Sequence, residues 1–282
     1  MSVRKYAMLF CLIGGIVVFW GVTSAAVTVP TASFLAAALR NQETLCGPSL
    51  EVVYEATQDK VNKTKFYSGT YIRTPDVLFS DETCFKNDKA VYTVKTSYDR
   101  SAGESRRYAV YSPEDPSKNH VRIQKSMEMP FNMQSFTETS RFAIYQGVLC
   151  DVIDKGTVAS ARESIDGHEC WRVTIPSTKP GTKDTIVWLD EDIGFCPRQI
   201  IQGFENIAEP DVISFRDYRE VKPGVWFPQQ HDIGFDTKER PVSLSIRITS
   251  ATAGKAYSSD QLLVNIPSGT RIYQGGNWYV QP

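Results

Sequence analysis

Residue types that commonly bind metals or act as nucleophiles are sparse in this chain. Its three histidines are His120, His168 and His231, and no two of them have the spacing that would place both on one metal ion. The densest group is His168, Glu169 and Cys170. Because neighbouring residues of a strand face opposite sides, only His168 and Cys170 would share a face. We expect no metal site, and a hydrolase would have to depend on this pair.

Other catalytic patterns are missing from the sequence. No serine stands between glycines in the pattern of a nucleophile elbow, and no glycine-rich phosphate loop is present. The acidic run of Asp190, Glu191 and Asp192 stands in a tight turn before Gly194, which favours solvated turn carboxylates over a catalytic pair. The sequence therefore predicts a protein without catalytic residues or a cofactor.

The first thirty residues predict export. Arg4 and Lys5 precede an apolar run from Tyr6 to Trp20, and small residues follow it. This is the layout of a signal peptide over residues 1–26, cleaved after Ala25 or Ala26. The alternative is an uncleaved anchor formed by the same segment. In both cases the rest of the chain lies outside the cytoplasm, and we expect the periplasm.

The later cysteines do not fix a disulfide pattern. Five of them follow the leader, namely Cys46, Cys84, Cys150, Cys170 and Cys196. In an oxidising compartment two pairs would leave one thiol free, and the sequence does not choose the pairing. Cys170 and Cys196 are expected to begin the first and third strands of one meander, roughly 10 Å apart, which is beyond disulfide reach.

Composition indicates one folded domain over residues 27–282. Apolar residues make up 41% of the chain and aromatic residues 11%, which is enough for a core. The 31 basic and 32 acidic residues give a net charge of -1, so nothing favours a nucleic acid partner. We expect a monomer.

Alternation with a period of two predicts strands through most of the mature chain. It is clearest over residues 241–250, where apolar and polar residues alternate and leave one dry face and one wet face. Helical spacing predicts a helix over Ala32–Gln42 and one or two short helices within Phe131–Asp154. The pattern returns to strands after residue 166, and one of these is Val225–Phe235.

These elements predict an α+β fold that is mostly β. About eleven antiparallel strands should form one twisted sheet that curves into an incomplete, half-open β barrel, with the short helices as a lid. The residues expected to line its concave apolar cavity are Val242, Leu244, Ile246, Ile248, Phe215 and Trp188. The other interpretation of the same pattern is that this face is simply the core, filled by the helices.

The second half of the chain resembles the LolA-like superfamily of periplasmic lipoprotein carriers and lipoprotein-binding proteins. The residues that carry the resemblance are His168–Pro176, Ile186–Asp190, Gly194, Pro197, Arg198, Phe215–Tyr218, Val225–Pro228 and Val264–Thr270. The resemblance implies an incomplete barrel whose cavity holds the acyl chains of a lipoprotein or another lipid.

Three functions are therefore weighed on the sequence. The first is a periplasmic binding protein for lipoprotein acyl chains or lipid, with a role in sorting lipoproteins to the outer membrane. The alternative is an envelope-stress sensor or interaction module that binds a membrane-bound partner protein. The third is a secreted hydrolase that uses His168 or Cys170.

Overall fold

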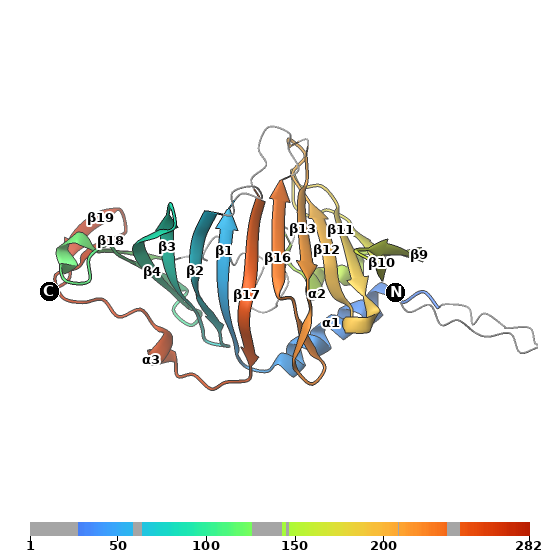
Figure 1. Cartoon of the computed structure of the whole chain (residues 1–282), viewed down its shortest axis with the longest axis horizontal. Helices are drawn as coiled ribbons and strands as arrows, with labels where there is room; N and C mark the ends of the chain where they lie inside the picture. The colour runs from blue at the N-terminus through green and yellow to red at the C-terminus, as the bar shows by residue number, and fades with distance from the viewer. Residues whose placement is uncertain (1–27, 59–63, 126–142, 145–146, 208, 236–242) are drawn as a thin grey trace, which may run out of the picture.

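One long, open sheet dominates the protein. The computed structural model describes residues 28–58, 64–125, 143–144, 147–207, 209–235 and 243–282. Fifteen strands form the sheet in the order β19-β18-β6-β5-β4-β3-β2-β1-β17-β16-β13-β12-β11-β10-β9, and Figure 1 shows it fanning out from β19 to β9. This confirms the expected open, mostly β fold, with more strands than the eleven expected.

The strands of the large sheet pair with antiparallel neighbours, except that β18 runs parallel to β6. Their bounds are β1 Leu50–Gln58, β2 Thr64–Arg73, β3 Val77–Lys86, β4 Lys89–Asp99, β5 Glu104–Val110, β6 His120–Gln124, β9 Thr157–Ile165, β10 His168–Ile175, β11 Thr185–Asp190, β12 Cys196–Gln202, β13 Asp211–Arg216, β16 Gln230–Phe235, β17 Ser243–Ala253, β18 Arg271–Gln274 and β19 Asn277–Val280. Two small sheets pair β14 Arg219–Lys222 with β15 Val225–Phe227, and β7 Ala143–Ile144 with β8 Gly147–Val148.

The helix α1, Ala32–Cys46, begins where the sequence predicted and runs four residues further. Thr31 caps its first turn by accepting a hydrogen bond from the backbone of Phe34. It ends at Gly47, whose φ of 84° is a conformation that glycine adopts without strain. Its apolar side packs on the half of the sheet formed by β10 to β13 (Figure 1).

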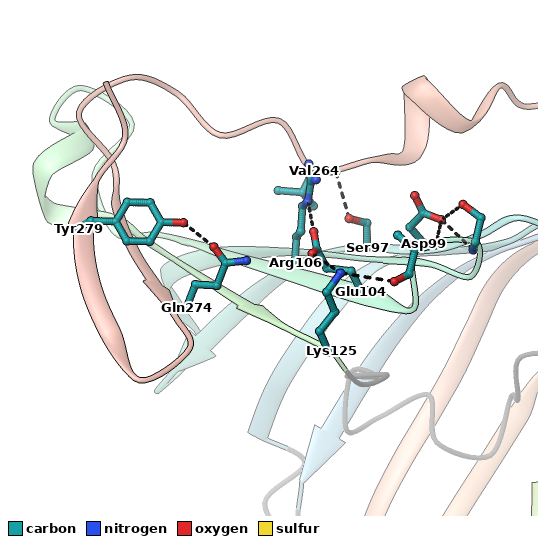
Figure 2. A network of polar contacts seen from close by, with 10 residues as sticks. Ser97, Asp99, Glu104, Arg106, Lys125, Val264, Gln274 and Tyr279 are labelled. Atoms are coloured by element: carbon teal, nitrogen blue, oxygen red, sulfur yellow. Dashed lines mark hydrogen bonds and ion pairs between the residues drawn. The ribbon is translucent and has the colours of Figure 1, made fainter.

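The two faces of the sheet are covered by different parts of the chain. We call the face that carries α1 the inner face. It is covered by α1, the short helix α2 (Leu149–Val152) and the β14–β15 hairpin. On the outer face, the C-terminal segment with α3 (Ser259–Leu262) crosses β2 to β6. The backbone of Val264 donates to the Ser97 hydroxyl at 3.1 Å and fastens this segment (Figure 2).

The element predictions fail at three places. The edge strand β9 was missed because its side chains are mostly exposed on both faces, so no alternation marks it. The strand expected over Val225–Phe235 is two strands, β15 and β16, separated by Pro228 and Gln229. The C-terminal hairpin β18–β19 was also missed. Of the helices expected within Phe131–Asp154, α2 and the 3-10 helix η3 (Ile153–Lys155) are present, and residues 131–142 lie outside the described residues.

The expected signal peptide or anchor lies within residues 1–27, which are outside the described residues. In the ranges that the structure describes, no helix combines the length and the apolar character needed to cross a membrane.

Candidate functional site

One row of directly opposed residues crosses seven strands of the inner face. Residues that face each other on neighbouring strands lie on the same side of a sheet. The pairings connect, in order, Phe215, His231, Ile246, Ala56, Tyr67, Cys84 and Tyr92. We call this set the central row. It joins the α1-covered half of the sheet to the other half.

Four of the predicted lining residues come together on this face. Leu244, Ile246 and Ile248 pack in one buried cluster with Val225 and Phe227 of the β14–β15 hairpin. Phe215 packs in a second cluster with α1 and with β10 to β13. All four are buried by the protein's own side chains. Val242 lies outside the described residues.

Trp188 is separated from this group. It stands between Val187 and Leu189, which face the α1 cluster, so its ring lies on the outer face. Its indole Nε1 donates to Glu163 Oε2 at 2.8 Å. Trp171, by contrast, is directly opposite Leu189. The apolar site on the inner face therefore does not include Trp188.

We call α1 together with the β14–β15 hairpin the roof. Polar contacts of Gln42 and Glu43 help to hold it in place. Gln42 on α1 donates to the Ile193 carbonyl at 3.5 Å and accepts from the Trp226 backbone at 3.3 Å. Glu43 forms a nearly buried ion pair with Arg73 on β2 at 3.0 Å. Apolar residues such as Leu35 and Leu39 also attach it to the sheet.

His231 is a buried member of the central row that sequence reasoning did not place in the site. Its ring stacks on Phe215 with 4.7 Å between centroids, and its side chain is completely buried. Burial without compensating charge lowers its pKa to about 3, so the ring is neutral at pH 7. The alternation of β16, which places His231 with Ile233 rather than with Asp232, was the available signal.

The pair His168 and Cys170 does not form an activated nucleophile. The Cys170 thiol points at the carbonyl oxygen of His168, 3.5 Å away. Burial, followed by the charge of Asp190, raises the pKa of the Cys170 thiol to about 12. Catalytic thiols need a lowered pKa, because the thiolate is the reactive form. In the described part of the chain, no group of three or more His, Cys, Asp or Glu side chains forms a metal site.

Asp190 is a buried ion-pair partner, which corrects its interpretation as a solvated turn acid. Its carboxylate accepts from Arg198 Nε at 2.9 Å and from Nη2 at 2.7 Å, and His168 Nδ1 lies 3.4 Å away. The guanidinium also lies over the Tyr218 ring at 5.0 Å. The Asp190 carboxylate is buried because Arg198 supplies the positive charge that a buried carboxylate requires.

The five described cysteines are buried and form no disulfide with one another. Cys170 and Cys196 both pair with Asp190, from either side, so they stand on the first and third strands of a meander as predicted. They behave as small apolar side chains in the core.

A separate cleft of about 960 Å³ lies on the outer face, over β1, β17, β16 and β13. Charged residues line much of it, including Glu55, Arg216, Asp232 and Arg247. Arg216 bridges Asp166 and Asp232 at 3.0 and 3.2 Å. The lining of this cleft is mixed polar and apolar and includes Ile248, whereas Glu55, Arg247 and Asp232 point away from the inner face.

Comparison with known proteins finds similarity at the level of fold. No protein-family model matches the sequence, and no curated protein matches it significantly. Among solved structures, an outer membrane lipoprotein-sorting protein domain from Vibrio parahaemolyticus is 11% identical, with 82% of this chain and 97% of that chain covered and a TM-score of 0.47. A DUF1329 family protein from Desulfovibrio piger has the same identity and coverage and a TM-score of 0.49.

LprF from Mycobacterium bovis is 13% identical, with 85% of this chain and 98% of that chain covered and a TM-score of 0.30. The lipoprotein-sorting domain belongs to the class of protein that the second half of the sequence resembles. All three are similar to this chain in outline only, so the function proposed below is drawn from this chain's own residues.

Proposed function

We propose that the protein is an exported binding protein of the cell envelope that holds the acyl chain of a lipid or lipoprotein between the roof and the inner face. The observation that carries the proposal is the apolar inner face, formed by Leu244, Ile246 and Ile248 beneath the hairpin and by Phe215 beneath α1, with Ile233 packed against both clusters. Sorting of lipoproteins to the outer membrane is the proposed role. The proposed location is the periplasm, with the protein acting as a monomer.

Acyl binding requires the roof to move, because the four lining residues are covered by the protein's own side chains. The guest would take over contacts that α1 makes in the closed form. Burial of an acyl chain contributes about 0.8 kcal/mol per methylene, so a chain of sixteen carbons gains about 12 kcal/mol at most. The guest would also have to replace the contacts of Val225 and Phe227, because the hairpin covers Leu244, Ile246 and Ile248. No catalytic group is needed for this function.

A fluorescent acyl probe tests the proposal. Binding should raise the emission of the probe, and lipid should be detected by mass spectrometry in the protein purified from cells. The variant Gln42→Leu keeps the side-chain volume and removes the bonds from Gln42 to the Ile193 carbonyl and to the Trp226 backbone, so we expect the probe to associate several-fold faster. Gln199→Leu is the matched control. Gln199 is directly opposite Trp188 on the outer face, away from the roof, so this variant should leave the rate unchanged.

The proposal fails if the folded protein binds no acyl probe and carries no lipid. It also fails if Gln42→Leu and Gln199→Leu change the association rate equally, because the roof would then play no part in entry.

Partner binding is a second candidate function, and the edge strand β9 favours it. β9 ends the sheet order, so in the described structure one of its sides lacks a neighbouring strand. Such an edge accepts an added strand from another protein. Ala161→Pro, which alters the edge, should then abolish capture of a membrane-bound partner and leave acyl-probe binding intact.

A further inference from the structure

Exposed apolar side chains gather at the end of the sheet formed by β4, β5, β6, β18 and β19. Ten large apolar side chains are exposed among the described residues, and half of them belong to these strands or to the residue after β5: Val91, Tyr111, Trp278, Tyr279 and Val280. Trp278 is 58% exposed. A concentration of this kind on one end of a protein usually marks an interaction surface.

The central row continues into this end as a ladder of rings. Tyr92 contacts Tyr111 with 4.9 Å between centroids, and Tyr111 stacks on His120 at 5.6 Å. His120 meets Trp278 at 6.2 Å, and Trp278 meets Tyr273 at 5.2 Å. The central row and these ring contacts therefore form one line of inner-face residues that leads from the roofed half to exposed aromatic side chains. We call these five residues, with Arg122 and Arg271, the aromatic end.

The aromatic end carries positive charge. Arg122 is directly opposite Arg107 on β5, and Arg271 is directly opposite His120. The strands β6, β18 and β19 contain no acidic residue. Burial, and then the charges of Arg271 and Arg107, lower the pKa of His120. Arg122 and Arg271 are exposed, so their positive charges would attract an external anion.

The ring geometry disfavours a ligand that stacks. Sugars and nucleic acid bases bind to the free face of an aromatic ring. Here Tyr111 and His120 use their faces on each other, and the Arg271 guanidinium lies over the Trp278 ring at 5.7 Å. Aromatic rings with polar groups, beside arginines, suit a lipid interface. There Trp and Tyr place their apolar ring toward the lipid and their polar group toward water.

We propose that the aromatic end docks on the surface of an anionic phospholipid membrane. The proposal rests on the proposed acyl-binding function and adds where the lipid would enter: the arginines bind lipid phosphates, and the central row leads from the bilayer toward the roof. Trp278 and Tyr111 would lie among the headgroups.

Co-sedimentation with vesicles tests the docking. The purified protein is mixed with vesicles of phosphatidylcholine alone, or with one third phosphatidylglycerol, at low and high salt. We expect clear binding to the anionic vesicles only, weakened by salt. Each basic residue near an anionic surface contributes about five-fold to binding, so Arg122→Gln with Arg271→Gln should lower the partition coefficient about thirty-fold.

Two matched controls separate docking from general charge or hydrophobicity. Arg219→Gln with Arg247→Gln removes the same charge from the outer-face cleft and should leave binding nearly unchanged. Trp278→Ala should weaken binding several-fold. Tyr279→Ala, next to it on the same strand but facing the other way and bonded to Gln274 (Figure 2), should have little effect.

Equal binding to both vesicle types, or an equal loss in both arginine pairs, would overturn the docking proposal. Capture of an acidic polysaccharide without vesicle binding would overturn it as well. The acyl-probe assay is run without vesicles, so the two proposals fail separately. Loss of probe binding with retained docking refutes only the acyl site, and retained probe binding without docking refutes only the membrane surface.

Discussion

Acidification from pH 7 to pH 5 is expected to lower the free energy of unfolding by about 2 kcal/mol through His231. Burial lowers the native pKa of this histidine to about 3, from an ordinary value of 6.5. Between these values the unfolded chain binds a proton that the native state does not bind. The contribution of His231 is therefore complete above pH 6.5 and is lost as the pH falls toward 3. At pH 5 the difference spans about 1.5 pKa units, at about 1.4 kcal/mol per unit.

Urea unfolding at pH 7, 6 and 5 measures this effect in the wild type and in His231→Leu. The variant should lose most of the pH dependence in this range, with a small remainder from His120, whose pKa is also lowered. Carboxylates with lowered pKa values, such as Glu51 beside Tyr257 and Lys255, act only below about pH 4.5. If His231→Leu retained the full pH dependence of the wild type, the buried neutral imidazole would not be its cause.

Three further predictions concern the core and the roof. Arg198→Met should cost about 3 to 5 kcal/mol in urea unfolding because it leaves the Asp190 carboxylate buried without its cation, and adding Asp190→Asn should recover much of the loss. The five described cysteines should resist a thiol reagent in the native protein and react fully in denaturant, because all are buried; rapid native labelling would contradict the core assigned to them. Gly194→Ala should destabilise more than Gly167→Ala in thermal melts. Both glycines have positive φ, but a Cβ at Gly194 would lie 2.0 Å from Gln42 Nε2, whereas one at Gly167 would meet nothing within 4 Å. Equal losses of stability in the two variants would mean that backbone strain alone is responsible, without a contact to Gln42.

Elements with one dry and one wet face were predictable from the sequence. β17 alternates buried and exposed residues, and α1 begins at a threonine cap, so local patterns were sufficient for both. The split of Val225–Phe235 carried its own signal, because Pro228 lacks the N–H that a continuing strand would need. β9 had no such signal, since an edge strand with both faces exposed has no apolar side to reveal it.

The site was harder to predict because its relations are long-range. The alternation identified Leu244, Ile246 and Ile248. The roof over them comes from the N-terminal helix and from the β14–β15 hairpin, and β15 had been predicted as part of a longer strand. The face of Trp188 depended on a register that a one-residue slip would reverse. Arg198 could not be assigned to Asp190 from the sequence, because their contact depends on the turn between β11 and β12. The ladder through Trp278 depends on a strand pairing between β6 and the C-terminus.

The centre of the sheet joins segments that are synthesised far apart in time. β1 pairs with β17, and Thr249 donates to the carbonyl oxygen of Val53 across 196 positions of the chain. β18 must likewise reach back to β6 before the aromatic end exists. Pairings of such high sequence separation form slowly, so the N-terminal strands remain without their final neighbours until the last segments are available. A chain with this connectivity would need protection of its unpaired strands until its C-terminus has emerged from the ribosome.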